Sequence, residues 1–555
     1  MLNDRRCGAS YGPGPAPAAA RTPDENRRPM LRPPSPPRPP AFRHARPLLA
    51  ALLIASQALW PLQGHAQVQP LPGLSDGAEM TATAERQLGD RIARELYRDP
   101  DYIDDPVLAD YVQDIWQRLL AAARTRGELT PELDERYAWQ VMIGRDRTVN
   151  AFALPGGYLG LHTGLIAITE TRDELASVLG HELSHVTQRH ISRMLTQQSR
   201  QAPLLLAAMI LGGLAAAKSR SGGDLGMAAM VGGQAMAMQK QLDFSRDMER
   251  EADRIGFGVM TQAGFSPRGA AAMFEKLQYA SRLNDNGSYP YLRSHPLTGE
   301  RLTEMEARFQ FRTEAVAPLA PQMEHAMIAA RARVLSRPGA DLLRQWLQAV
   351  DSSEFARARP AQQAGMLYAA ARSAVELRDL KAARALAARL AARVQGDAPA
   401  ERLARLLQAE VELDAGNGAA AAALLDPKAH PKDRAELVLA AQAAVAARQP
   451  DGVAAPLRDW VALHPRDATA WRTLSAVYGV QGETLRAIRA DAEANVAVLD
   501  YVAARDRFRA AQDWVRQAGP GTRVDHYEAS IIDTRAREVE AKAKEQLADK
   551  DKPLQ

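Results

Sequence analysis

The stretch GHELSHVTQRH, residues 180–190, constrains the fold more than any other part of the chain. It holds the pattern His-Glu-x-x-His, at His181, Glu182 and His185, followed by His190. The chain has 11 histidines in 555 residues, so the pattern is expected by chance only on the order of 0.01 times. It therefore predicts a metal-binding helix, and the alternative is a polar helix surface that happens to carry histidines.

Helix geometry separates the residues of this stretch by role. Each residue of an α-helix turns by about 100°, so His181 and His185 lie about 40° apart and share one face. Glu182 lies on the flank of that face and can reach a water on a metal ion. His190 lies about 180° from His181, which predicts that it points elsewhere and is a surface residue. The motif thus supplies two ligands, whereas a catalytic zinc site uses three and a water.

The third ligand must come from further along the chain. The extended motif with a nearby third histidine is excluded, because Gln188 and Ile191 stand at its glycine and histidine positions. In DFSRDMEREADRIGFGVM, Glu249 and Asp253 are four residues apart and share a helix face, while Glu251 lies off it. A ligating glutamate and an aspartate that accepts the N–H of a ligating imidazole form a sensible pair. The alternative is an ordinary solvated face.

Residues 67–315 mix helix and strand signals, so we expect an α+β domain with a small β-sheet. WQVMIGRDRTVNAFALPGGYLGLHTGLIAI predicts strands interrupted by Pro155, Gly156 and Gly157. TRDELASVLGHELSHVTQRHISRML predicts a helix that begins with a capping box of Thr171 and Glu174.

From about residue 320 the chain is rich in Ala, Leu and Arg, which predicts an all-α domain over residues 316–515. The segment WRTLSAVYGVQGETLRAIRADAEANV fits the tetratricopeptide pattern, with weaker units at 367–390 and 435–465. A generic helical bundle is the alternative. Residues 516–555 form a charged tail, and after Arg535 we expect a loose helix or disorder. The residues at consensus spacings are Trp471, Leu474, Tyr478, Gly482, Ala487 and Ala494.

The composition of residues 1–66 indicates a leader segment. Residues 1–46 are rich in Pro, Arg and Ala and cannot form a core. An apolar run from Leu48 to Leu59 follows a basic segment, which predicts a Sec-type signal peptide starting at Met30 and cleaved after Ala66. An uncleaved anchor is the alternative. We expect the mature protein in the periplasm and without thiols, since Cys7 is the only cysteine.

The positive charge of the chain belongs to this leader. Residues 1–66 hold nine arginines and three acidic residues, which leaves 61 basic and 63 acidic residues and a net charge of about −2. We therefore expect no nucleic-acid partner.

Residues 203–238 are apolar and rich in Met and Gly. A helical hairpin over the core is the simpler interpretation. The other is a lid or a surface that touches membrane or unfolded polypeptide, because methionine-rich surfaces adapt to varied partners.

The pair GHELSH and EREADRIGF resembles peptidase family M48, and SHPLTGER with the tetratricopeptide segment resembles its periplasmic branch. The resemblance implies a zincin-like domain with one Zn²⁺ per chain, bound by His181, His185 and Glu249. It implies that Glu182 is the catalytic base and that Asp253 supports a ligand histidine.

The resemblance also covers residues around the cleft. His295, in SHPL, would lie on a loop that caps the zinc, and Arg301 would lie near the site. Asn150 and Ala151 would belong to an edge strand to which an extended substrate adds. Without the resemblance, Ser294-His295-Pro296 is simply a turn before a helix.

The function implied is a zinc endopeptidase acting on stalled or unfolded outer-membrane β-barrel precursors. The repeat domain would contact the β-barrel assembly machinery, and peripheral membrane contact is a further expectation. The competing hypothesis is a chaperone or scaffold whose repeats do the binding and whose zinc site is capped or structural.

Overall fold

The computed structural model describes residues 80–198, 246–282, 288–310, 319–425, 433–519 and 524–551. All of these belong to one compact unit, Ser75–Gln555, and a second unit comprises Met1–Leu74. The predicted leader and the segment 203–238 lie outside the described residues. Within the described ranges, no helix is both long and apolar enough to cross a membrane.

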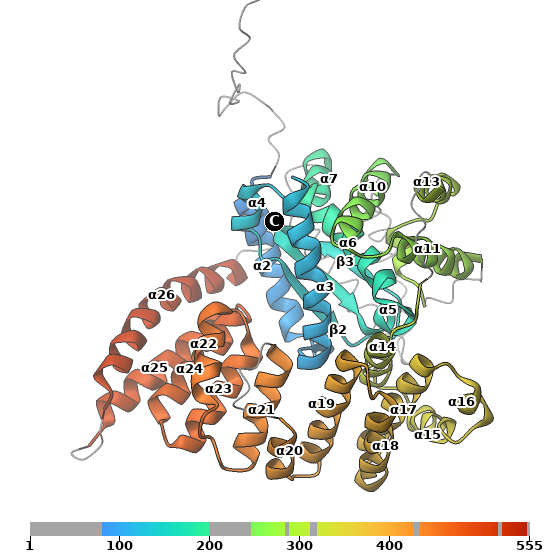
Figure 1. Cartoon of the computed structure of the whole chain (residues 1–555). Helices are drawn as coiled ribbons and strands as arrows, with labels where there is room; N and C mark the ends of the chain where they lie inside the picture. The colour runs from blue at the N-terminus through green and yellow to red at the C-terminus, as the bar shows by residue number, and fades with distance from the viewer. Residues whose placement is uncertain are drawn as a thin grey trace, which may run out of the picture. The chain divides into compact units, whose positions relative to one another are not determined.

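The described chain is mostly helical with a small four-stranded sheet, which confirms the predicted fold class. The sheet and the helices around it form the first part of the unit (Figure 1). Its elements are α2 (Ala82–Arg98), β1 (Tyr102–Ile103), α3 (Pro106–Thr125), α4 (Pro131–Arg136), β2 (Gln140–Gly144), β3 (Ala151–Leu154), η1 (Pro155–Gly157), β4 (Tyr158–His162), α5 (Thr163–Ile168), α6 (Arg172–Thr187), α7 (His190–Gln198), α10 (Arg246–Gln262), α11 (Pro267–Arg282), α12 (Tyr291–Ser294) and α13 (Gly299–Gln310).

The sheet has the strand order β1-β2-β4-β3, so β3 lies at an edge. Strand β2 pairs in parallel with β4, whereas β1 and β3 are antiparallel to their neighbours. The short turn η1 joins β3 to β4, with φ of 71° at Gly156 and 86° at Gly157. Glycine adopts this left-handed backbone without a steric penalty. The predicted interruption at Pro155, Gly156 and Gly157 is confirmed.

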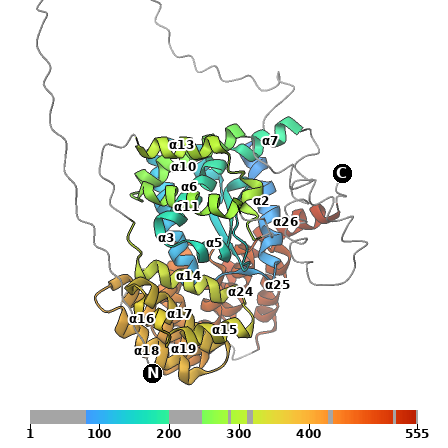
Figure 2. The ribbon, with the colours of Figure 1, turned by 90° about the vertical axis from the view of Figure 1, so that its right-hand side faces the viewer.

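Helix α6 carries the His-Glu-x-x-His motif and lies in the interior. The Thr171 hydroxyl accepts the Glu174 N–H at 3.2 Å, while the Glu174 carboxylate accepts the N–H of Glu170 at 2.8 Å. The first half of the predicted capping box is therefore present, and the second half is displaced by one residue. Helix α6 packs on α10, α11 and α3 (Figure 2). Burial on several sides holds its side chains in fixed positions.

The second part of the unit is entirely helical, and most helices pack against the next along the chain. Trp471, Leu474 and Tyr478 are buried on one helix of a hairpin that turns at Gly482, with φ of 76°. The elements are α14 (Met323–Leu335), α15 (Ala340–Ala349), α16 (Ser353–Arg357), α17 (Pro360–Glu376), α18 (Leu380–Arg393), α19 (Ala398–Asp414), α20 (Gly418–Leu424), α21 (Arg434–Ala446), α22 (Ala454–Leu463), α23 (Ala468–Gln481), α24 (Thr484–Ala497), α25 (Tyr501–Gln517) and α26 (His526–Asp551).

Residues 526–551 form a packed helix, so the expectation of a loose helix or disorder after Arg535 is wrong for the described part of the tail. In α26, Ile532 and Val539 are buried in a cluster with Phe508 of α25. The Gln546 side chain accepts the N–H of Tyr501 at 2.9 Å and so caps the beginning of α25. Charge alone suggested a loose end, but an apolar stripe binds α26 to α25.

A buried arginine, Arg331, and a largely buried one, Arg434, join the two parts of the unit. Arg331 of α14 is 1% exposed and forms bidentate ion pairs with Asp105 and Glu410. Asp105 caps α3 by accepting the Leu108 N–H at 2.8 Å. Arg434 of α21 binds the neighbouring Asp104 at 2.6 Å. The beginning of α3 is thereby fixed to helices of the second part.

Candidate metal centre

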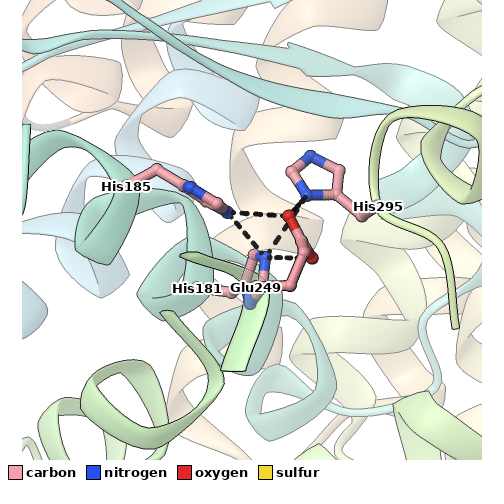
Figure 3. A group of neighbouring side chains, drawn as sticks. All are labelled: His181, His185, Glu249 and His295. Carbon is pink, nitrogen blue, oxygen red and sulfur yellow. Dashed lines mark hydrogen bonds and ion pairs between the residues drawn. The ribbon is translucent and has the colours of Figure 1, made fainter. Parts of the chain in front are cut away.

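Helix α6 places His181 and His185 side by side, as the spacing predicts. Their Nε2 atoms are 3.0 Å apart, and the side chains are 6% and 0% exposed. Figure 3 shows both imidazoles pointing into one shared space.

Helix α10 brings the acidic partners to these histidines. A Cβ atom at Gly256 would lie 2.9 Å from the backbone oxygen of Gly180, so only glycines allow this close approach of α6 and α10. The approach brings Glu249 Oε2 to 3.5 Å from His181 Nε2 and Glu249 Oε1 to 3.4 Å from His185 Nε2. The residues predicted as ligands therefore converge.

The spacing of the donor atoms fits a bound metal ion. Ligands at about 2.1 Å from a tetrahedral ion lie about 3.4 Å from one another. The distances among His181, His185 and Glu249 run from 3.0 to 3.5 Å. Two imidazoles and a carboxylate are also a donor set typical of zinc in peptidases. The residues present thus fit a metal of this kind.

Asp253 and Arg301 orient the first of these ligands. Asp253 Oδ1 lies 2.9 Å from His181 Nδ1, which leaves Nε2 of that ring directed at the metal position. Arg301 donates to both carboxylate oxygens of Asp253, at 2.6 and 2.9 Å, and pairs with Glu249 at 2.9 Å. Arg301 is 5% exposed, so these contacts are shielded from water.

His295 is the fourth member of the cluster. It follows α12 and is 1% exposed. Its Nδ1 lies 2.9 Å from Glu249 Oε1 and 3.4 Å from His181 Nε2, so four ligand atoms share the space in Figure 3. Tyr291 stacks on the ring at 4.6 Å between centroids. The loop thus places a fourth possible ligand atom in the cluster.

Glu182 lies between this cluster and the edge strand. It is fully buried, and its Oε2 accepts the backbone N–H of Ala153 at 2.9 Å. Its Oε1 lies 3.4 Å from His295 Nε2 and makes no hydrogen bond within the described residues. A carboxylate held in this way has one oxygen directed at the metal cluster.

Strand β3 has main-chain groups on its open side. Asn150 O accepts the N–H of His162 at 3.0 Å, so by the antiparallel alternation Ala151 and Ala153 direct their N–H and C=O groups away from β4. The main-chain carbonyl of Asn150 is therefore hydrogen-bonded within the sheet and does not face the open edge. The buried side-chain oxygen of Asn150 makes no hydrogen bond among the described residues. Ala151, by contrast, has its main-chain N–H and C=O groups on the open edge.

The chain itself pairs next to this edge. Val149 N–H donates to Ser288 O at 2.8 Å, and Tyr291 N–H donates to Val149 O at 3.2 Å. The segment that leads to His295 therefore lies along the continuation of β3, and it bounds the open edge on the side of Val149.

The pKa values of the site residues follow from burial and charge. Burial lowers the pKa of His185 well below its ordinary value, so its ring is neutral and offers a lone pair. Burial would also lower the pKa of His181, but Asp253 and Glu249 outweigh it and raise that pKa to about 10. Metal binding at His181 must therefore displace a proton. Burial opposes ionisation of Asp253, yet Arg301 and His181 hold its pKa below the ordinary value.

The prediction that His190 is a surface residue is wrong. His190 is 0% exposed, and its Nδ1 lies 2.8 Å from Nδ1 of His185. The prediction assumed one continuous helix, but α6 ends at Thr187 and Arg189 has a φ of 54°. The left-handed residue turns α7 so that His190 faces back toward α6. No glycine marks this break, so the sequence carries no signal for it.

A helix with His-Glu-x-x-His and a third ligand from a neighbouring helix is the metal site of a metallopeptidase. Residues 107–309 match the model of peptidase family M48. Residues 107–309 belong to this family, and their buried metal-binding group of His181, His185 and Glu249 is intact.

Several curated proteins are similar to the chain. The Beta-barrel assembly-enhancing protease of Escherichia coli K12 is 31% identical over 320 residues, which cover 55% of this chain and 61% of the relative. The protein of the same name from Yersinia pestis is 29% identical over 459 residues, 80% of this chain and 89% of the relative. Mitochondrial metalloendopeptidase OMA1 of Arabidopsis thaliana is 31% identical over 184 residues, 33% of this chain and 34% of the relative. The matched region thus spans less than two thirds of the Escherichia coli relative.

Proposed function

We propose that the chain is a zinc-dependent endopeptidase that acts on unfolded polypeptide. The observation that carries the proposal is the convergence of His181, His185 and Glu249 at metal-ligand spacing, with Glu182 between them and an open strand edge. We assign His181, His185 and Glu249 as ligands of one zinc ion.

The chemistry follows from the position of Glu182. Zinc, when bound, supplies a Lewis acid that polarises the scissile carbonyl and lowers the pKa of water. Glu182 takes the proton of the attacking water and delivers it to the leaving amine. Its hydrogen bond from Ala153 keeps this carboxylate beside the strand edge. Asp253 acts on His181 rather than on the substrate, since it contacts Nδ1 of that ring.

The substrate is an extended polypeptide that adds to β3. Ala151 and the carbonyl of Ala153 provide main-chain pairing, which recognises backbone rather than sequence. Such an enzyme accepts varied unfolded segments. The names of the Escherichia coli and Yersinia pestis relatives support outer-membrane β-barrel precursors as substrates.

The cellular setting completes the proposal. The predicted signal peptide supports a periplasmic location, and the repeat helices provide a surface for the β-barrel assembly machinery. The proposed function includes peripheral contact of the protein with a membrane, and we expect no nucleic-acid partner. In this role the protein aids assembly and degrades stalled precursors.

A second function is favoured by the position of His295. With His295 as a fourth ligand the metal site is closed, and closed zinc sites are typical of structural rather than catalytic centres. A chaperone or scaffold with a capped metal would have this geometry. The two functions are compatible if His295 withdraws, because its departure opens the ligand position that catalysis needs.

The test compares cleavage of an unfolded β-barrel precursor by the purified chain with verified zinc content. We expect activity in wild type, a loss of at least about a hundredfold in Glu182→Gln and a rise in His295→Ala. The exposed Glu354→Gln and His526→Ala are the matched controls and should behave as wild type. Wild-type rates in Glu182→Gln would refute its role as base. Zinc binding and precursor binding without cleavage in any variant would favour the chaperone.

A further inference from the structure

His190 and Glu251 extend the contacts of the metal-binding group, because His190 contacts the ligand His185 and Glu251 contacts His190. His190 Nδ1 lies 2.8 Å from His185 Nδ1, and His190 Nε2 lies 3.0 Å from Glu251 Oε2. Arg193 donates to the same Glu251 oxygen at 2.9 Å. The His190 ring is fully buried, whereas the Glu251 side chain is 30% exposed.

Only one arrangement of protons on His185 and His190 fits these contacts once His185 binds metal through Nε2. Its Nε2 must then carry a lone pair, so the proton of the neutral ring sits on Nδ1. That N–H donates to Nδ1 of His190, which must be unprotonated. The proton of His190 therefore sits on Nε2 and donates to the Glu251 carboxylate.

We propose that His190 is a positioning residue, which fixes the tautomer and ring orientation of His185 and connects that ligand to Glu251. The proposal rests on the proposed function of His185 as a metal ligand. Helix α10 would then orient both histidines of the motif. Asp253 acts directly on His181, and Glu251, from the same helix, acts on His185 through His190.

Helix geometry explains why Asp253 contacts its histidine directly whereas Glu251 acts through His190. Glu249, Glu251 and Asp253 stand on one helix, and about 200° separates Glu251 from Glu249. Glu251 therefore cannot contact the ligand cluster from the face that Glu249 and Asp253 share. The break at Arg189 places a histidine in the intervening space, and its two ring nitrogens span the distance between His185 and Glu251.

Polar substitutions at position 190 test the direction of these hydrogen bonds. Asparagine puts its Oδ1 near the place of Nδ1 and still accepts from His185. Glutamine puts its amide Nε2 near the place of the ring Nε2, where it donates to Glu251 but no longer accepts from His185. Leucine removes both interactions at similar volume. We measure the zinc Kd of the full chain by competition with a chelator, which needs no catalytic activity.

We expect the zinc Kd to rise about 10 to 100-fold in His190→Leu. His190→Gln should resemble the leucine variant, and His190→Asn should stay closer to wild type. The matched control is His325→Leu, which replaces an equally buried histidine in α14 and should lower stability without changing the zinc Kd. Circular dichroism verifies that each variant folds.

The outcomes separate this inference from the proposed function. A wild-type zinc Kd in His190→Leu would overturn it, as would tighter binding by His190→Gln than by His190→Asn. If zinc affinity falls equally in His190→Leu and His325→Leu, the effect is one of general stability and the inference fails. If wild type itself binds no zinc, the proposed function fails, and this inference with it.

Discussion

Replacing Arg331 tests whether buried charge pairing holds the two parts of the described unit together. Its guanidinium makes five hydrogen bonds of 2.5 to 2.8 Å, to Asp105, Glu410 and the Tyr368 hydroxyl. The partner carboxylates are each 11% exposed. Arg331→Ala would leave two nearby carboxylates in a poorly solvated space.

The expected cost follows from this burial. Breaking a buried ion pair by removing one partner costs about 3–5 kcal/mol, because the remaining charge is uncompensated. Burial opposes ionisation of Asp105, but Arg331 holds its pKa below the ordinary value, so the carboxylate is charged at neutral pH. Asp105 keeps its capping bond to Leu108, which places the estimate toward the lower end, about 3 kcal/mol.

Urea unfolding followed by tryptophan fluorescence measures this loss. The matched control is Arg344→Ala in α15, whose partner Asp341 is fully exposed, and we expect no measurable change there. The triple variant Arg331→Met, Asp105→Asn, Glu410→Gln removes the charges together and should recover more than half of the loss. Equal losses in the single and triple variants would refute the reasoning, since packing rather than orphaned charge would then be the cause.

Two further perturbations probe the site and its support. Gly256→Ala forces α6 and α10 apart, because its Cβ would lie 2.9 Å from Gly180, so we expect a loss of about 1–3 kcal/mol and weaker zinc binding by chelator competition. Gly479→Ala in α23, whose Cβ meets open space, should leave zinc binding unchanged, and equal affinities in both variants would contradict the helix-contact argument. Burial lowers the pKa of His325 to about 4. The unfolded chain takes up this proton near pH 6.5, so stability falls between about pH 6.5 and 4, by roughly 3 kcal/mol in all. His325→Gln should flatten this part of the unfolding curve against pH, and an unchanged slope would show that other groups cause it.

Local geometry explains which parts of the site were predictable. The shared face of His181 and His185 depends only on the turn per residue of one helix. The same holds for Glu249 and Asp253, and the strand interruption at residues 155–157 depends on the backbone preferences of proline and glycine. Each of these features is set by residues within one or two turns of one another.

The roles of His190 and Asn150 depended on contacts that sequence spacing does not carry. A left-handed Arg189 with no glycine signal turned His190 inward. The pairing of Asn150 with His162 follows from strand register. Each required the relative placement of segments that fold separately.

The sequence by itself determined the metal motif, the mixed fold class and the helical second part, because periodicity and turn residues act over short distances. Only the tertiary structure decided that His190 contacts His185 and that Arg331 joins the two parts, and it placed His295, which the family resemblance alone had assigned to the site, in the cluster. Those contacts link residues far apart in the chain or across a helix break. They arise where helix packing and buried charge select one arrangement among many that the sequence pattern allows.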